Sequence, residues 1–227
     1  MKKFFVIAAM LLAGFTASAQ INIGAGYLNE NWALKEGSNK AGNIALNGFY
    51  AGASYNIPIV EGLGVAPGAY FTMAFGYLRD TEGSKDIYKV GSYALQAPMS
   101  SMSIIVPVHV TYSMDLGPGK AFAYLGPAFQ YGLKLKSELT TNNGDLNALI
   151  SEFAGKDAFV FENAYAKDDS GNRDMKPFDV KLDVGFGYNW KFLQFNAGYT
   201  WGFLNRDTDE DASAHANGIH AGIAVVF

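Results

Sequence analysis

Strict alternation of apolar and polar residues over Phe178 to Phe192 is the feature that most limits what this chain can fold into. The apolar positions are Phe178, Val180, Leu182, Val184, Phe186, Tyr188, Trp190 and Phe192, and the residues between them are charged, amide or glycine. A period of two residues predicts a β-strand with two unlike faces. The apolar face could meet a soluble core or lipid, so this segment alone leaves both a soluble sheet and a membrane barrel open.

Segments that alternate in the same way recur along the chain and predict about eight strands. They lie near residues 21–28, 49–57, 63–77, 104–114, 121–135, 178–192, 193–203 and 219–227. Most are close to the roughly ten residues that a tilted strand needs to cross a bilayer. We therefore predict an all-β fold, an eight-stranded antiparallel up-and-down transmembrane β-barrel.

Other kinds of membrane protein do not fit the composition. No segment beyond the N-terminal region has 18 consecutive apolar residues, which excludes a bundle of transmembrane helices and leaves a closed barrel as the way to cross a bilayer. The 26 glycines, 15% aromatic and 17% charged residues fit β structure. Without Lys2 and Lys3 the chain has 15 basic and 21 acidic residues, so nucleic acid is not an expected partner.

The N-terminal residues 1–19 are interpreted as a secretory signal peptide. Lys2 and Lys3 precede an apolar run, and small residues at 17–19 suit cleavage. The run has about a dozen residues, too few for a transmembrane anchor, so we expect cleavage to leave residues 20–227 as one barrel domain. The chain has no cysteine, which excludes a lipoprotein anchor, disulfides and cysteine-ligated metals.

The connections between the predicted strands alternate between short and long. Short turns fall near 58–62, 115–120 and 190–193, and long polar loops near 29–45, 79–101, 136–177 and 205–216. Outer-membrane barrels combine short periplasmic turns with long external loops, whereas a soluble sandwich has no reason to sort its loops in this way. This asymmetry favours a membrane barrel with both termini in the periplasm.

Three stretches carry a resemblance to a known family: IIVPVHVTYSMDL followed by KAFAYLGPAFQYGL, the pair LDVGFGYNW and FNAGYTWGFLN, and the ending at Phe227. The chain resembles the small outer-membrane β-barrel domain family of Gram-negative bacteria, of the PorT-like and OmpX- or OmpA-barrel-like kind. The likeness covers nearly all of the mature chain. It implies a multi-pass barrel of the cell outer membrane, inserted by the barrel assembly machinery, which reads the last strand and its terminal aromatic, here Phe227. It implies no shared catalytic residues.

Polar side chains at inward-facing positions form a candidate network in the lumen. Its members are Lys134, Asp179, Lys181, Asp183, Gln194, Asn196, His109 and His220. Enclosed charges must be paired, so we expect the lysines and aspartates of this set to pair across two consecutive strands near the outer end. Because an eight-stranded interior is just wide enough to be filled by its own side chains, we expect no large open pore.

Signals for catalysis or metal binding are weak. His109 shares a face with Thr111 and Ser113 and so resembles the His and Ser pair of barrel-type lipid A deacylases, but it is predicted to point inward, away from lipid. His109, His215 and His220 are scattered and do not form a metal site. We therefore expect no catalytic residues, no metal and no cofactor.

The longest predicted loop, 136–177, contains a short apolar pattern within DLNALISEF. The residues Leu146, Leu149, Ile150 and Phe153 would share one side of a short helix. This segment could contact a partner, cover the barrel mouth or pack on itself.

The resulting functional hypothesis is a non-enzymatic outer-membrane barrel with a structural or interaction role through its external loops. One alternative is a narrow channel for small or apolar solutes, and another is a lipid-modifying barrel enzyme. The expected partners are outer-membrane lipid and lipopolysaccharide, the assembly machinery and another envelope protein.

Overall fold

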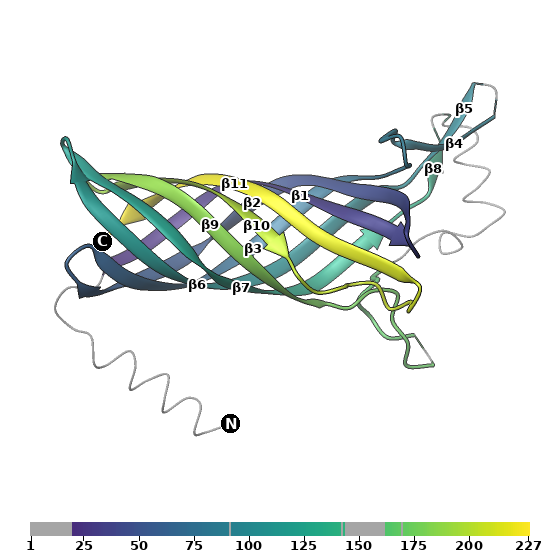
Figure 1. Cartoon of the computed structure of the whole chain (residues 1–227). Helices are drawn as coiled ribbons and strands as arrows, with labels where there is room; N and C mark the ends of the chain where they lie inside the picture. The colour runs from purple at the N-terminus through teal and green to yellow at the C-terminus, as the bar shows by residue number, and fades with distance from the viewer. Residues whose placement is uncertain (1–19, 91, 142, 144–161, 169) are drawn as a thin grey trace.

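The computed structural model describes residues 20–90, 92–141, 143, 162–168 and 170–227. Eight of its strands close into a barrel: β1 (Gln20–Glu36), β2 (Asn39–Val60), β3 (Leu63–Arg79), β6 (Pro98–Leu116), β7 (Gly119–Ser137), β9 (Phe178–Trp190), β10 (Leu193–Gly202) and β11 (Ala212–Val226). Each pairs antiparallel with its neighbours in the ring order β1-β11-β10-β9-β7-β6-β3-β2 (Figure 1). The predicted eight-stranded antiparallel barrel is confirmed.

Some sequence-based predictions fall on residues that the structure does not describe. The signal peptide predicted at 1–19 and the apolar set Leu146, Leu149, Ile150 and Phe153 lie outside the described residues, so both stay predictions. Within the described ranges, no helix is long and apolar enough to cross a membrane.

The first and last strands close the barrel. β1 and β11 pair from Asn22 with Val226 to Glu36 with Ala212. The ladder continues to the last residue, because the amide of Phe227 donates to the carbonyl of Ile21 at 2.9 Å. Since every barrel strand has a partner on both sides, the ring leaves no open edge.

The two ends of the barrel differ. At one end, called here the short-turn end, β2 joins β3, β6 joins β7 and β9 joins β10, each through a two-residue turn. The start of β1 and the end of β11 lie at the same end (Figure 1). The opposite, long-loop end carries the connections at 80–97, 138–177 and 203–211.

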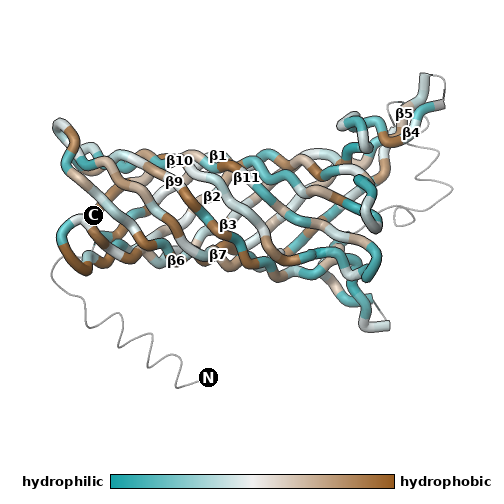
Figure 2. The backbone as a smooth tube through the Cα atoms, viewed as in Figure 1, coloured by the Kyte–Doolittle hydropathy of each residue, from teal (hydrophilic) through white to brown (hydrophobic). Residues whose placement is uncertain are grey.

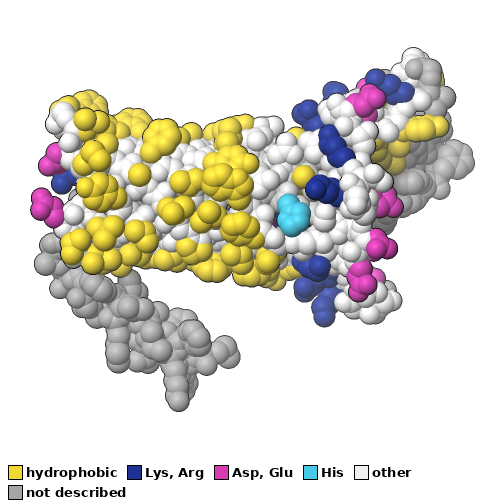
Figure 3. Space-filling model, viewed as in Figure 1, with side chains coloured by type: hydrophobic (Ala, Val, Ile, Leu, Met, Phe, Trp, Pro, Cys, Tyr) yellow, Lys and Arg dark blue, Asp and Glu magenta, His cyan; other side chains and the backbone are white. Residues whose placement is uncertain are grey.

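The outer wall of the barrel carries an apolar belt. One residue from each barrel strand illustrates it, each between 40 and 68% exposed: Ile23, Phe49, Phe71, Val106, Phe129, Phe186, Phe195 and Ile223. The belt covers the barrel from its short-turn end, and polar residues and Lys and Arg side chains gather toward the long-loop end (Figures 2 and 3). An outer face with exposed apolar side chains on every barrel strand suits the hydrocarbon of a bilayer rather than water.

The long loop predicted at 29–45 is wrong. β1 continues to Glu36 and β2 begins at Asn39, so these strands meet in a two-residue turn. Side chains still alternate between the two faces in this region, but the apolar residues now point inward and the polar ones outward. Trp32 and Leu46 point inward and are fully buried, while Asn31 points outward. Beyond the belt, the barrel is therefore built like a water-soluble one, with its apolar face inside.

The other predicted long loops are shorter than expected. β6 begins at Pro98, within the loop predicted at 79–101, and β11 begins at Ala212, within the loop predicted at 205–216. The first of these loops also folds locally. Its hairpin of β4 (Asp86–Val90) and β5 (Tyr93–Gln96) pairs with β8 (Thr140–Thr141) in an outlying sheet at the long-loop end (Figure 1).

A β-bulge at Leu133 changes which side chains of β7 face inward. Ser103 pairs with Gly132, but its neighbour Met102 pairs with Lys134, so Leu133 is an extra residue on β7. An extra residue reverses the alternation beyond it. Leu135 therefore packs in the core and Lys134 points outward, so the prediction that Lys134 faces the lumen is wrong.

Candidate functional site

Part of the barrel interior is not filled by side chains. It contains a cavity of about 840 Å³ that extends from residues at the short-turn end, such as Glu61 and Lys191, to Glu30 and Lys181 deep in the lumen. The expectation of a lumen packed with side chains is therefore wrong for this part of the barrel. The cavity is a feature of the described residues on which a functional role could rest.

Glycines on the strands explain why the cavity stays open. A β-carbon at Gly185 would lie 2.2 Å from the ring of Tyr124, and one at Gly222 would lie 2.3 Å from the hydroxyl of Tyr50. A β-carbon at Gly52 would lie 2.7 Å from the ring of Tyr70. Because the glycines have no side chain, these aromatic rings lie against the barrel wall and leave space along its axis.

Two histidines and one aspartate meet on the wall of the cavity. His109 Nε2 lies 3.0 Å from Asp183 Oδ2, and His220 Nε2 lies 3.8 Å from Asp183 Oδ1. His220 Nε2 also lies 2.8 Å from the hydroxyl of Tyr124. The structure thus brings together three residues of the predicted polar network, which come from β6, β9 and β11.

Two amides of the predicted network also line the cavity. The hydroxyl of Tyr50 donates to Asn196 Oδ1 at 3.0 Å, which joins β2 to β10 across the lumen. Gln194 lies nearer the short-turn end and lines the same cavity. These two residues are therefore placed where the alternation of β10 predicts.

A buried ion pair closes the inner end of the cavity. Lys181 Nζ on β9 donates to Glu30 Oε1 on β1, and the two side chains are 3 and 9% exposed. The partner of Lys181 is therefore a residue outside the predicted network, and it comes from a strand that is not adjacent to β9. Glu30 was missed because it falls in the range predicted as a loop, although the alternation does continue through it.

A second cluster fills the barrel between this ion pair and the long-loop end. Arg206 is fully buried, and its guanidinium lies 4.5 Å from the ring centre of Trp32 and 5.0 Å from that of Tyr165. Arg206 Nη2 donates to the Tyr165 hydroxyl at 2.7 Å and to the Pro177 carbonyl at 3.2 Å. We call Trp32, Tyr165 and Arg206 the plug.

The plug joins two connections to the barrel wall. The amide of Ala164 donates to the carbonyl of Leu135 on β7 at 2.9 Å, and the amide of Lys176 donates to the carbonyl of Arg206 at 2.7 Å. Burial raises the pKa of the Tyr165 phenol, so this group stays a neutral hydroxyl beside Arg206. Neither Arg206 nor Tyr165 lies in a periodic segment, so the sequence offered no signal for them.

Asp179 lies beside the plug rather than in the cavity. Its side chain is fully buried and its Oδ1 accepts a hydrogen bond from the amide of Leu204 at 3.2 Å. Its position inside the barrel agrees with the alternation of β9. Its partner comes from the connection that follows β10, which strand periodicity does not reveal.

The arrangement of the histidines gives no catalytic geometry at the lipid surface. His109 faces the lumen, and the nearby Ser113 hydroxyl donates to the Gly62 carbonyl at 3.4 Å. Among the residues that the structure describes, no group of three His, Asp or Glu side chains is placed to hold a metal ion.

Comparisons with known proteins agree with this architecture. The family model described as "Outer membrane protein beta-barrel domain" matches residues 11–207. No curated protein is detectably similar in sequence.

Several solved barrels are similar in structure at low sequence identity. Ail, the attachment invasion locus protein of Yersinia pestis, is 12% identical with a TM-score of 0.43, and the alignment covers 93% of this chain and 100% of that one. Neisserial surface protein A is 12% identical with a TM-score of 0.44, and the alignment covers 93% of this chain and 100% of that one. OprG from Pseudomonas aeruginosa is 12% identical with a TM-score of 0.46, and the alignment covers 94% of this chain and 98% of that one.

Proposed function

This chain belongs to the outer membrane protein beta-barrel domain family, and from that premise we propose that it is a non-enzymatic barrel, closed to solutes, that works through contacts at its long-loop end. The observation that carries this proposal is the plug. Arg206 is fully buried between Trp32 and Tyr165, above an ion pair that itself spans the lumen from β1 to β9. Among the residues that the structure describes, the plug and this ion pair therefore lie between the cavity and the long-loop end.

The closed lumen argues against the alternative of a narrow channel. We expect purified protein in a planar bilayer to give no stepwise conductance, and liposomes that contain it to take up small solutes no faster than empty ones. Reproducible conductance steps that disappear with a bulky substitution in the lumen would instead support a channel.

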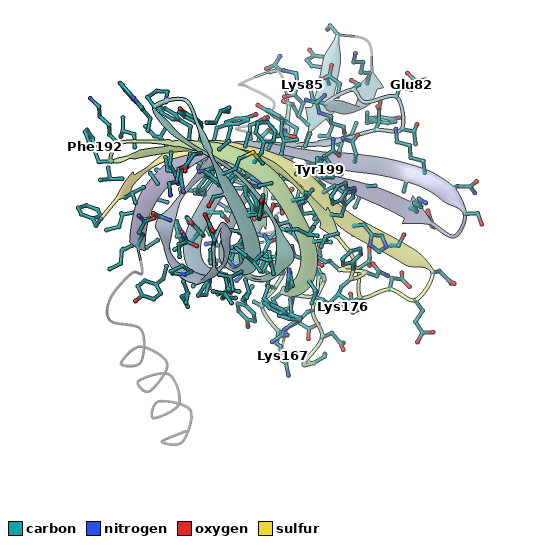
Figure 4. All side chains as sticks on the ribbon, turned by 60° about the vertical axis from the view of Figure 1, so that its left-hand side comes forward. Glu82, Lys85, Lys167, Lys176, Phe192 and Tyr199 are labelled. Atoms are coloured by element: carbon teal, nitrogen blue, oxygen red, sulfur yellow. The ribbon has the colours of Figure 1, made fainter. Side chains whose placement is uncertain are left out.

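The proposed contact surface consists of the outlying sheet and of the polar outer faces of β1 and β2 beyond the apolar belt, residues 29–36 and 39–47, which we call the strand extensions. Asn29 Nδ2 donates to Asn47 Oδ1 at 3.0 Å, and Asn43 Nδ2 donates to Asn31 Oδ1 at 3.3 Å, so β1 and β2 present a ladder of asparagine side chains. Figure 4 shows Glu82 and Lys85 near the outlying sheet and Lys167 and Lys176 on another connection, all away from Phe192 at the short-turn end. Tyr88 on β4 adds an exposed ring.

Site-specific photocrosslinking in intact cells tests this surface. A photoreactive phenylalanine analogue placed at Asn31 or Tyr88 should give discrete crosslinked products. The same analogue at Ser113, which faces the lumen at the opposite end, is the matched control and should give none. No discrete product from either long-loop position, or products from the control alone, would contradict the proposal.

Lipid and lipopolysaccharide are also proposed partners. The apolar belt supports contact with acyl chains, and the Lys and Arg side chains just beyond it (Figure 3) suit the phosphate groups of lipopolysaccharide. For the enzyme alternative, the enclosed position of His109 supports no reaction at the lipid face. Deleting the gene should leave the mass spectrum of lipid A unchanged, and a shifted mass would favour a lipid-modifying enzyme.

A further inference from the structure

We propose that the cavity at the short-turn end is a binding site for a small neutral molecule rich in hydroxyl groups, such as a monosaccharide or disaccharide. The proposed function concerns the opposite end of the barrel, so this site is independent of it. The proposal rests on the size of the cavity, on how its aromatic rings are held and on the contacts of the polar groups that line it.

The size and enclosure of the cavity are those of a ligand site. Its volume of about 840 Å³ lies within the range of roughly 300–1,000 Å³ that is typical of small-molecule pockets. The Glu30–Lys181 pair and the plug close it on one side. A ligand would enter from the short-turn end, where Glu61 and Lys191 mark the opening.

The aromatic residues of the cavity are fixed against its wall. Tyr50 and Tyr70 meet edge to face, with ring centres 5.7 Å apart and an interplanar angle of 81°. Tyr124 lies against Gly185 and hydrogen-bonds to His220. Rings held in this way present rigid apolar surface without losing further side-chain freedom on binding, and the C–H faces of a sugar ring can pack against such surface.

The polar groups define the charge of the ligand. In the deep part of the lumen that the structure describes, Lys181 is paired with Glu30, and Asp183 Oδ2 lies 3.0 Å from His109 Nε2, while Glu61 and Lys191 lie at the opening. An anionic ligand deep in the cavity would therefore lose water without finding a free cation, and a cationic ligand would have to displace His109 from Asp183. An apolar ligand would instead bury polar side chains such as Asn196 and Thr111 without replacing their contacts with water, which is unfavourable. A neutral ligand with hydroxyl groups avoids these costs.

The test measures sugar binding to the purified, folded protein. Methyl β-glucoside and maltose serve as probes, and a dimethylamine-oxide detergent is used because detergents with sugar headgroups would compete. Saturation-transfer NMR and calorimetry report binding. Thr111→Trp fills the cavity, and Val110→Trp is the matched control, because Val110 is adjacent in sequence but faces outward.

We expect at least one of the two sugars to bind the wild type and the Val110→Trp variant equally, and Thr111→Trp to bind it at least about tenfold more weakly. Gln194→Trp fills the cavity from another strand and replaces Thr111→Trp if that variant lacks the heat-dependent gel mobility of a folded barrel. Absence of binding of both sugars at about 10 mM would overturn the proposal and indicate a water-filled lumen. Equal binding by the filled and control variants would overturn it as well.

Discussion

At the scale of single residues, the interior of this barrel is held by side chains that meet across the ring. Glu30 and Lys181 are separated by 151 positions in the sequence, yet they form an ion pair shielded from solvent. Forming such a pair adds little net stability, because both charges lose their hydration. Removing one partner is costly, because the other charge then stays buried without compensation.

The ion pair gives the first prediction. Lys181→Met should lower the free energy of unfolding by about 3–5 kcal/mol, because it leaves the Glu30 carboxylate unpaired. The double variant Glu30→Leu with Lys181→Leu should recover most of this loss. Urea titration in liposomes, followed by the gel shift of the folded barrel, measures these values.

Lys134→Met is the control for this series. Lys134 points outward beyond the bulge, so its substitution should change stability by no more than about 0.5 kcal/mol. If the double variant were as unstable as Lys181→Met, the pairing would not explain the loss.

At the scale of strands, the sequence predicted those parts of the fold in which one rule holds without interruption. In β9 and β10 the apolar residues face outward along the whole strand, and the predicted ranges 178–192 and 193–203 differ from the observed ones by one or two residues. The same rule places His109, Asp183 and Asn196 in the lumen. These predictions depend on local alternation alone.

The sequence-based predictions failed where the rule changes along a strand. In β1 and β2 the apolar face turns from outside to inside beyond the belt, so residues 29–45 lacked a consistent outer face and were predicted as a loop. In β7 one bulged residue moved Lys134 out of the lumen. Arg206 and Tyr165 depend on contacts between distant connections, which no local pattern encodes.

The bulge in β7 gives a second prediction. Deleting Leu133 should be tolerated, because it removes the extra residue and leaves Leu135 facing inward. Deleting Leu125 in the regular part of the same strand should abolish folding, because every later side chain of β7 would change sides. Refolding into micelles, followed by the unheated gel shift, distinguishes the two variants. Loss of the folded band in both would contradict the assignment of the bulge.

The C-terminal end of β11 gives a third prediction. Phe227 exposes its ring while its backbone pairs with Ile21, and we propose that the barrel assembly machinery reads this ring. Phe227→Ala should reduce the amount of folded protein in cell envelopes, yet refold in micelles like the wild type. An equal loss in both settings would assign Phe227 a role in stability rather than in recognition by the assembly machinery.

At the scale of the whole molecule, the two ends of the barrel carry different candidate binding surfaces. The plug and the strand extensions occupy the long-loop end, whereas the cavity, the start of β1 and the end of β11 lie at the short-turn end. If the long-loop end faces the outside, the cavity can exchange solutes with the periplasm alone. The orientation in the membrane therefore decides which compartment each surface serves.

The absence of native cysteine makes this orientation directly measurable. Ser38→Cys lies in the exposed turn at the end of the strand extensions, and Glu61→Cys lies in an exposed turn at the other end. A maleimide carried on a polyethylene glycol too large for outer-membrane pores should label Ser38→Cys in intact cells and leave Glu61→Cys unmodified. Both should react after the outer membrane is permeabilised. The opposite pattern would reverse the proposed orientation, and labelling of both in intact cells would contradict a barrel that separates the two ends by a membrane.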